Sequence, residues 1–269
     1  MIVLPQRRRP IAPVIDWNNP LSKGLVFDFD PLAPWDRLGN QAINNGATTI
    51  TGIGGLAKNF VRASSQFVDL GTTPWANFGA GDFSLEVIFT TVSAATRQIF
   101  FGKDVAASAG NRQLLIQMQA TGVLGLSWFD AAATGIADLA TSATYSANTR
   151  YHVIFQRVGA SAECWVNGVQ QAFVTTGSHT GYVTMASNAI STYLGGRNFT
   201  ASNQYVDGSI ELFRARNRAL TPGEVFKLRE APYRIYRGIE IPMRKAAATF
   251  NPAWASSANS TIVGGQIAA

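Results

Sequence analysis

Cysteine and histidine are nearly absent from this sequence, which contains one cysteine, Cys164, and two histidines among 269 residues. A single cysteine cannot form an internal disulfide, and the chain lacks the grouped Cys and His ligands of a structural zinc site. No run reaches the roughly 18 apolar residues of a membrane-spanning helix. We therefore expect a protein without a metal, a cofactor or a membrane partner.

An apolar signal-peptide core is also missing. Residues 1–4 are apolar, but Pro5 and the run Arg7, Arg8 and Arg9 follow at once. A secretory signal needs 7–15 apolar residues after its basic region. The sequence therefore predicts synthesis in a reducing cytoplasm without a signal peptide.

Charged residues are scarce, at 14% of the chain against roughly 25% in ordinary soluble domains. The net charge is +6, with basic residues gathered at 7–9 and more loosely from Arg229 to Lys245. No zinc-finger, RRM or helix-turn-helix pattern accompanies them. We interpret the excess as a solubilising surface rather than a nucleic-acid site.

Glycine and aromatic residues, in contrast, are plentiful, with 25 glycines and 11% aromatics. Such a composition is typical of short strands joined by tight turns. The clearest strand spans 83–90, where apolar residues alternate, and Asn167-Gly168 is a strong hairpin signal. Further strands are predicted at 25–30, 47–51, 57–62, 66–70, 97–102, 112–119, 123–129, 151–158, 163–166, 169–174, 190–195 and 205–216. This pattern predicts an all-β protein, a two-sheet antiparallel sandwich.

One helix is predicted near 221–231, because Thr221, Pro222 and Glu224 form an N-terminal capping signal and Pro232 ends the segment. The alternation also predicts a core between or beneath the sheets. Its members are Phe83, Leu85, Val87, Phe89, Val153, Phe155, Val166, Leu194, Ile210 and Leu212.

Two terminal segments differ from the body in composition. Prolines interrupt residues 1–22, and residues 246–269 are rich in Ala, Ser, Asn and Gly. We interpret them as extended arms around a domain at 23–245, because their apolar residues are too sparse to form a core of their own. The candidate assembly contacts in the arms are Arg7, Arg8, Arg9, Ile15, Trp17, Phe250, Trp254 and Ile262.

Several stretches carry a resemblance to a known group. They are 151–157, 164–168 (Cys-Trp-Val-Asn-Gly), 193–196 (Tyr-Leu-Gly-Gly), 207–210 (Asp-Gly-Ser-Ile) and 217–225 (Asn-Arg-Ala-Leu-Thr-Pro-Gly-Glu-Val). In this order they resemble laminin-G-like, concanavalin A-like domains over residues 23 to about 230. The resemblance implies a jelly-roll sandwich, a scaffold that serves lectins, glycosidases and structural modules alike.

A narrower resemblance lies at the flanks of this domain. Residues 15–26 and 231–236 resemble the flanking segments of laminin-G-like proteins encoded in tailed-phage and prophage structural regions. Ala231 and Tyr233 depart from the usual Asn-Pro-Trp-Gln-Ile-Phe pattern of the second segment but keep its aromatic character. This resemblance implies a protein of the phage virion.

Catalytic patterns are missing. Glucanases of this fold carry a Glu-x-Asp-x-Glu strand, which places two carboxylates on one face, whereas Glu86 stands alone on its strand. Asp28 and Asp30 are the only carboxylates two residues apart, and we expect them to be a solvated strand end. His152 is expected to be a packing residue and His179 to lie in a solvated turn. We therefore expect no catalytic residues and no enzyme activity.

Candidate residues for Ca²⁺ and sugar binding are few. Laminin-G-like domains can hold Ca²⁺ at the sandwich rim, but Asp104, Asp130 and Asp207 fall short of six to eight oxygen ligands. The tryptophans Trp75, Trp128 and Trp165 could stack on sugar rings, although a role in the core or an interface is the simpler interpretation. Cys164 is expected to be a small buried hydrophobe.

The sequence and the resemblance together predict a non-enzymatic phage virion structural protein. It would be a capsid decoration (cement) protein or a minor tail component, held by its arms to phage structural proteins as a homo-oligomer or in many copies. The alternative is a carbohydrate- or receptor-binding module of the virion. A glycosidase is the hypothesis that the residues favour least.

Overall fold

The computed structural model describes residues 14–32, 36–40, 42–105, 112–132, 134–197 and 204–237. All of these residues belong to one compact unit. No helix in the described ranges is long and apolar enough to cross a membrane.

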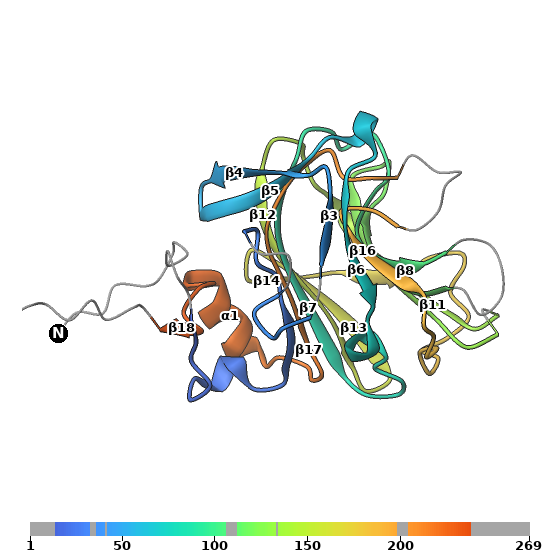
Figure 1. Ribbon diagram of the computed structural model, residues 1–269. Coiled ribbons are helices and arrows are strands. Elements are labelled where there is room, and N and C mark those ends of the chain that lie inside the picture. Colours follow the sequence, from blue (N-terminus) through green and yellow to red (C-terminus); the bar gives the residue numbers. More distant parts are fainter. Residues whose placement is uncertain are drawn as a thin grey trace, which may run out of the picture. The chain divides into compact units, whose positions relative to one another are not determined.

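Two eight-stranded antiparallel sheets face each other and form the predicted sandwich (Figure 1). We call them the front sheet and the back sheet. The front sheet has the order β15 (Phe173–Thr175), β11 (Ile136–Thr144), β10 (Val123–Phe129), β9 (Arg112–Met118), β8 (Gln98–Asp104), β16 (Ser191–Leu194), β6 (Phe67–Thr72) and β3 (Ile43–Asn45). The back sheet has the order β14 (Val169–Gln171), β13 (Ser161–Val166), β12 (Arg150–Val158), β7 (Phe83–Thr91), β17 (Gly208–Arg216), β5 (Gly55–Phe60) and β4 (Thr48–Gly52), with β2 (Leu25–Asp28) also paired to β17.

The main core fills the space between the sheets. On β7, Phe83, Leu85, Val87 and Phe89 are fully buried there, as their alternation predicts. The other predicted core residues are buried as well, but Leu212 belongs to a second cluster on the far side of the back sheet. Because successive side chains point to opposite faces of a strand, β7 contributes to both clusters.

A covering layer lies on the outer face of the back sheet. It consists of α1 (Pro222–Glu230), the short strands β1 (Val14–Ile15) and β18 (Tyr236–Arg237), and the 3₁₀ helix η1 (Pro20–Ser22). Ile88, Ile154 and Leu212 of the sheet pack against Val225 and Leu228 of α1. Figure 1 shows α1 and β18 on the side of the back sheet that faces away from β8 and β16. Two further 3₁₀ turns, η2 (Arg62–Ser64) and η3 (Pro74–Ala76), connect strands.

Helix α1 begins as the sequence predicts. The Thr221 hydroxyl accepts a hydrogen bond from the Glu224 amide, and the Glu224 carboxylate accepts one from the Thr221 amide. These two bonds satisfy backbone donors that a helix start leaves without an intrahelical partner.

Residues 14–22 differ from the extended arm that the sequence predicts for 1–22. Strand β1 pairs with β18, with Ile15 opposite Tyr236 and Val14 opposite Arg237. Asp16 also forms an ion pair of 2.7 Å with Arg237. The apolar side chain of Ile15 therefore packs on its own domain, and both ends of the described domain leave it side by side.

The expectation of a solvated strand end is wrong for Asp28, which is completely buried. Strand β2 pairs with β17 and places Asp28 opposite Arg214, whose Nε donates to its carboxylate at 2.9 Å. The Tyr236 hydroxyl donates to the same carboxylate at 2.7 Å. Asp30 forms an ion pair of 2.6 Å with Arg37.

The structure also corrects one predicted strand and adds one that the sequence did not predict. The segment 169–174 is not one returning strand, because Val169–Gln171 joins the back sheet and Phe173–Thr175 joins the front sheet. The chain therefore crosses between the sheets at Ala172. Strand β11 (Ile136–Thr144) was not predicted at all; its alanines, threonines and serine give no apolar alternation along most of its length.

Candidate functional site

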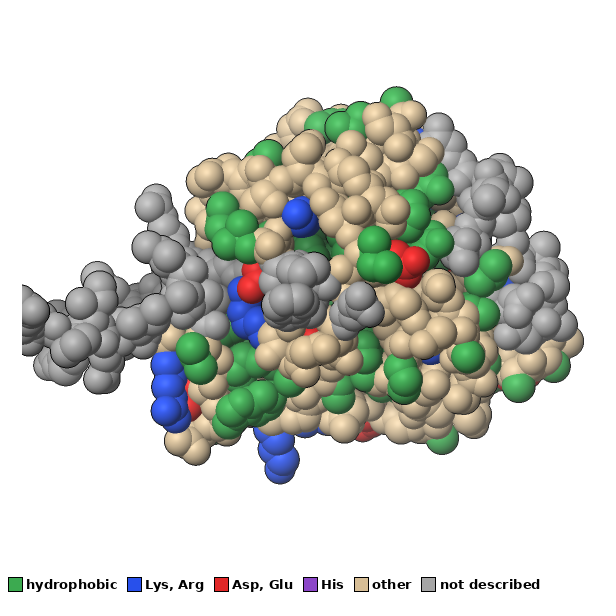
Figure 2. Space-filling view, in the orientation of Figure 1, with side chains coloured by type: hydrophobic (Ala, Val, Ile, Leu, Met, Phe, Trp, Pro, Cys, Tyr) green, Lys and Arg blue, Asp and Glu red, His purple; other side chains and the backbone are tan. Residues whose placement is uncertain are grey.

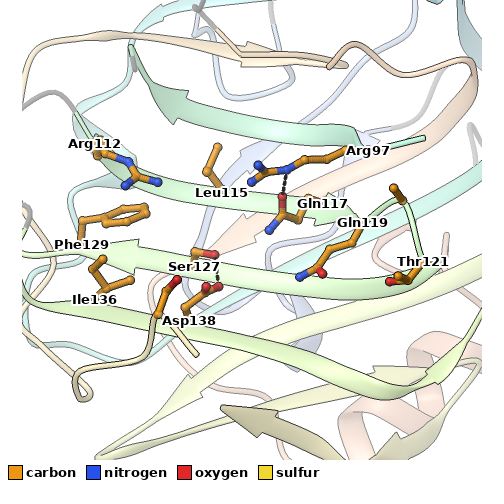
Figure 3. A pocket seen from close by; sticks show the side chains of 12 residues that line it. Arg97, Arg112, Leu115, Gln117, Gln119, Thr121, Ser127, Phe129, Ile136 and Asp138 are labelled. Atoms are coloured by element: carbon orange, nitrogen blue, oxygen red, sulfur yellow. Dashed lines mark hydrogen bonds between the residues drawn. The ribbon is translucent and has the colours of Figure 1, made fainter. Parts of the chain in front are cut away.

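A groove of about 430 Å³ lies on the outer face of the front sheet (Figure 3). It crosses strands β9, β10 and β11, reaches Arg97 just before β8, and is open to solvent on one side. Its lining consists of Arg97, Arg112, Leu115, Gln117, Gln119, Ala120, Thr121, Ser127, Phe129, Ile136, Asp138 and Ser178. Polar and apolar side chains therefore share one concave surface.

The apolar part of the groove is a small cluster separate from the main core. Leu115 and Phe129 are buried there with Ile99, and Ile136 packs against them. Their neighbours along the strands, such as Leu114 and Trp128, point inward to the main core. The guanidinium of Arg112 lies 3.9 Å above the Phe129 ring. This arrangement gives the groove a flat, apolar end under a cation.

Two arginines line the groove with unused hydrogen-bonding capacity. Arg97 Nε donates to Gln117 Oε1 at 2.6 Å, and its two terminal nitrogens donate to no described residue. Arg112 Nε is buried and has no hydrogen-bond partner in the described part of the chain. The nearest carboxylate oxygen to it belongs to Asp104, 3.7 Å away. Burial, and then the positive charges of Arg197 and Arg112, lower the pKa of Arg97.

The acidic side of the groove is built by Asp138 on β11. Its carboxylate accepts hydrogen bonds from the Ser127 hydroxyl and the Thr176 hydroxyl, both at 2.6 Å. Its backbone N–H donates to His179 Nδ1 at 3.1 Å. These contacts fix the segment after β15 as a wall of the groove, and Ser178 lines the groove from that wall.

Carboxylates are sparse in the groove. Among the described residues that line it, Asp138 is the one carboxylate, whereas glycoside hydrolysis uses two carboxyl groups that flank the scissile bond. No group of three or more His, Cys, Asp or Glu side chains that could hold a metal ion occurs in the described ranges.

A second hollow, of about 570 Å³, lies near the end of α1 and is lined by Ile53, Gly54, Arg150, His152, Asn167, Arg229, Glu230 and Pro232. Its inner charges are already paired. Arg150 binds Glu211 at 2.9 Å, and His152 Nε2 contacts the Glu86 carboxylate at 3.0 Å. Although this hollow is larger, it therefore offers a ligand fewer free polar groups than the groove does.

The predicted assembly contacts are distributed between the described and undescribed parts of the chain. Ile15 is 7% exposed and packs within its own domain, so it is not available to a neighbouring subunit in this arrangement. Trp17 is 60% exposed. The remaining candidates, Arg7, Arg8, Arg9, Phe250, Trp254 and Ile262, lie outside the described residues.

The aromatic and acidic candidates do not come together. Trp128 is fully buried, while Trp75 and Trp165 pack against two different hydrophobic clusters. Of the three aspartates considered for Ca²⁺, Asp104 is buried on β8 in an ion pair with Arg197.

The structure confirms the prediction for Cys164 and revises those for the two histidines. Cys164 is buried, as expected. The expectation that His179 is simply solvated is wrong, because it accepts the Asp138 N–H. His152 is buried, but it binds Glu86 and is more than a packing residue.

Sequence reasoning missed the groove itself. Arg97 and Arg112 lie at the starts of two predicted strands, and Gln117 and Ser127 follow at polar positions. The available signal was the alternation of polar residues along 112–119 and 123–129, which marks an uncovered face. Figure 3 shows these side chains projecting from one side of the sheet.

On the face shown in Figure 2, the described apolar side chains lie in small separate groups among polar surface. On this face, the described residues therefore form no broad apolar patch of the kind that marks a docking surface.

Comparison with known proteins identifies the scaffold. The sequence model of the "concanavalin A-like lectin/glucanases superfamily", of laminin G type, matches residues 63–226. No curated protein sequence matches the chain.

Solved structures with the same fold include three from bacteria and a trypanosome. The binding domain of Paraclostridial Mosquitocidal Protein 1 has a TM-score of 0.61 at 14% identity, covering 78% of this chain and 52% of that one. Domain 4 of AbnA, a GH43 extracellular arabinanase from Geobacillus stearothermophilus solved with arabinotriose, has a TM-score of 0.58 at 18% identity, covering 76% and 97%. Trypanosoma rangeli sialidase has a TM-score of 0.55 at 15% identity, covering 81% and 34%. This chain thus spans about half of the first, nearly all of the second and a third of the third.

Proposed function

Because the chain belongs to the concanavalin A-like lectin/glucanases superfamily, we propose that it is a non-catalytic saccharide-binding module that uses the groove on the front sheet. The observation that carries the proposal is the lining of that groove. It combines an apolar end at Leu115, Phe129 and Ile136 with polar groups that converge on the same space. Binding sites for small ligands commonly pair an apolar surface with a few placed polar groups.

A sugar has complementary features. Its C–H groups pack on apolar side chains, and its hydroxyls both donate and accept hydrogen bonds. In the groove, the Asp138 carboxylate can accept from a hydroxyl, while Arg97 and Gln117 can donate to one. The arabinanase domain of the same fold was solved with arabinotriose, which supports a saccharide as the ligand class.

We infer that binding is not followed by hydrolysis. A general acid and a second carboxylate would have to face each other across the sugar bond, and the lining contains only Asp138.

A glycan array with the full-length protein tests this proposal. Ser178 is exposed and lines the groove, so Ser178→Trp places a large side chain in it without disturbing the core. Ser161→Trp, on an exposed residue of the back sheet, is the matched control. We expect binding by the wild type and Ser161→Trp and loss of binding in Ser178→Trp. No glycan binding by the wild type, or full binding by Ser178→Trp, would refute the groove as the site.

We further propose that the domain is mounted on a phage virion, as a capsid decoration protein or a minor tail component made in the host cytoplasm. The flanks at 15–26 and 231–236 resemble those of phage structural proteins. A structural observation also favours mounting, because β1 and β18 pair on the covering layer of the back sheet. The groove lies on the opposite face of the sandwich, so attachment through both flanks leaves it accessible.

In this proposal, Arg7, Arg8, Arg9, Trp17, Phe250, Trp254 and Ile262 contact phage structural proteins, and the protein is present as a homo-oligomer or in many copies. Deleting 246–269 should leave a folded domain that no longer enters particles normally. Mass spectrometry of purified particles measures its copy number. Incorporation of the truncated chain at the wild-type copy number would show that the segment is dispensable.

A further inference from the structure

The two arginines of the groove make its charge asymmetric. Figure 3 shows the guanidinium groups of Arg97 and Arg112 on either side of Leu115, directed toward one another along one edge of the groove. Asp138 lies across the floor from them, on β11. A ligand in the groove therefore meets cations along one edge and a single carboxylate along the other.

Among the described residues, neither arginine has a carboxylate oxygen within hydrogen-bonding distance. Asp104 is the nearest anion to Arg112, but its Oδ2 is 3.1 Å from Arg197 and 3.7 Å from Arg112 Nε, so it is shared. In the described part of the chain, the side chain of Arg97 has the amide oxygen of Gln117 as its hydrogen-bond acceptor. Arg112 and Arg197 thus approach the same buried carboxylate, and Arg97 hydrogen-bonds to a neutral amide.

The cost of this arrangement is visible at Arg97. Burial and the positive charges of Arg197 and Arg112 lower the pKa of Arg97, and the carboxylates of Asp138 and Asp104 offset this only in part. An anion placed between Arg97 and Arg112 would relieve the repulsion. It would also accept hydrogen bonds from the terminal nitrogens of Arg97, which donate to no described residue.

We propose that the groove selects acidic saccharides, with a uronic-acid carboxylate or a sulfate ester held between Arg97 and Arg112. This inference rests on the saccharide-binding function proposed above. Guanidinium groups match planar or branched oxyanions with paired N–H donors. The sugar ring would then extend over Leu115 and Ile136, with a hydroxyl directed to Asp138.

The geometry also explains why Arg112 is suited to this role. Its guanidinium carbon lies over the Phe129 ring, 3.9 Å from the ring centroid. A stacked guanidinium has little conformational freedom left to lose when a ligand binds. Lysine offers a point charge instead of a planar set of donors, so it should replace Arg112 only in part.

The first test is an array of neutral, uronic-acid and sulfated glycans probed with the full-length protein. We expect the bound glycans to be acidic. Bound glycans that are all neutral would overturn the acidic preference and leave saccharide binding standing. An array without any bound glycan would remove the proposed function and this inference with it.

The second test is isothermal titration calorimetry with matched ligands. Trigalacturonic acid is compared with its methyl ester, and dextran sulfate with dextran, so each pair differs only in its anionic groups. We expect the acidic member to bind about tenfold or more tightly at low salt, and the difference to shrink as salt rises. Preference for the trigalacturonate pair assigns a carboxylate to the site, and preference for the dextran pair assigns a sulfate. Equal affinities within both pairs would overturn the inference.

Variants locate the effect in the groove. Arg97→Gln and Arg112→Gln should each lose most of the preference for the acidic ligand and keep the weaker binding of the neutral one. Arg112→Lys should keep part of it. Arg229→Gln removes an exposed positive charge at the second hollow and is the control. An equal loss in Arg229→Gln would show that net charge, and not the groove, attracts the ligand. Arg97→Gln keeps the test valid if Arg112→Gln fails to fold.

Discussion

Replacing Glu86 by glutamine removes one charge from a cluster that is completely buried beneath α1. The Glu86 carboxylate accepts from Arg216 Nη1 at 3.0 Å, lies 3.5 Å from Arg214 Nη1 and contacts His152 Nε2 at 3.0 Å. Burial by itself would raise the pKa of Glu86, but the charges of Arg214 and Arg216 and the contact with His152 hold it well below its usual range. The carboxylate is therefore charged at neutral pH.

The magnitude follows from the charge balance. Arg214 and Arg216 are fully buried and face two buried carboxylates, Glu86 and Asp28. Glutamine leaves an uncompensated positive charge in this space, and breaking a buried ion pair in this way costs about 3–5 kcal/mol. That loss is a large share of a total stability of about 5–15 kcal/mol.

Urea unfolding at pH 7, followed by circular dichroism, measures the effect. With a slope of about 3 kcal/mol per molar urea, the midpoint of Glu86→Gln should fall by about 1–1.7 M. Glu230→Gln, on the exposed last turn of α1, is the control and should change the midpoint little. The double variant Glu86→Gln/Arg216→Met restores the balance and should be less destabilised than the sum of its single variants. A loss below about 1 kcal/mol in Glu86→Gln, or strict additivity in the double variant, would refute this account of the cluster.

Three further predictions concern single groups. Glu224→Gln should lower stability by about 1 kcal/mol at pH 7. The capping box and Arg218 lower the pKa of Glu224 to about 2 despite some burial. The stabilisation by the Glu224 carboxylate is therefore complete above its ordinary pKa of 4.5 and should fade in thermal melts as the pH drops toward 2. Burial lowers the pKa of Lys103 to about 8, so between pH 8 and 10.5 the unfolded chain binds more protons than the folded chain does. The stability of the wild type relative to Lys103→Met should therefore rise with pH across that interval in urea titrations. A stability difference that does not change with pH would contradict the burial of the Lys103 charge. Burial raises the pKa of the Cys164 thiol, so Ellman's reagent should leave it unmodified in the folded protein and react with it at once in denaturant; rapid reaction of the folded protein would contradict its position in the core.

The sequence predicts the features of this fold that depend on neighbours along the chain. The alternation at Phe83, Leu85, Val87 and Phe89 predicts both the strand and its buried face, because one side chain in two must turn inward. The capping box of α1 is equally local, since Thr221 and Glu224 are three residues apart.

The sequence does not predict features that depend on contacts between residues far apart along the chain. Asp28 follows an apolar strand and precedes Pro31, so its local sequence is that of an exposed strand end. Its partners Arg214 and Tyr236 lie 186 and 208 positions away. No periodicity in the sequence relates such residues, and only the pairing of β2 with β17 brings them together.

The groove was missed for a related reason. Strands β9, β10 and β11 each contribute one or two polar residues to the groove, and each strand alone resembles an ordinary solvent-facing side. Arg97, Gln117 and Asp138 form a site only because β8, β9, β10 and β11 are adjacent. Arg97 and Arg112 contribute to the net charge of the chain, but composition does not show which charges lie close together in the fold.

The pairing of β1 with β18 has a mechanical consequence for the domain. Since Val14 and Arg237 are partners in an antiparallel pair, tension applied to the two ends separates that pair one residue at a time, in the manner of a zipper. The paired strands are only two residues long, and the ion pair between Asp16 and Arg237 is largely exposed. Neither sheet therefore carries the load until the β1–β18 pair has opened. Under the proposed mounting on a particle, a shear load would be absorbed first by this β1–β18 pair, which can close again when the load is released, while the front sheet keeps its shape.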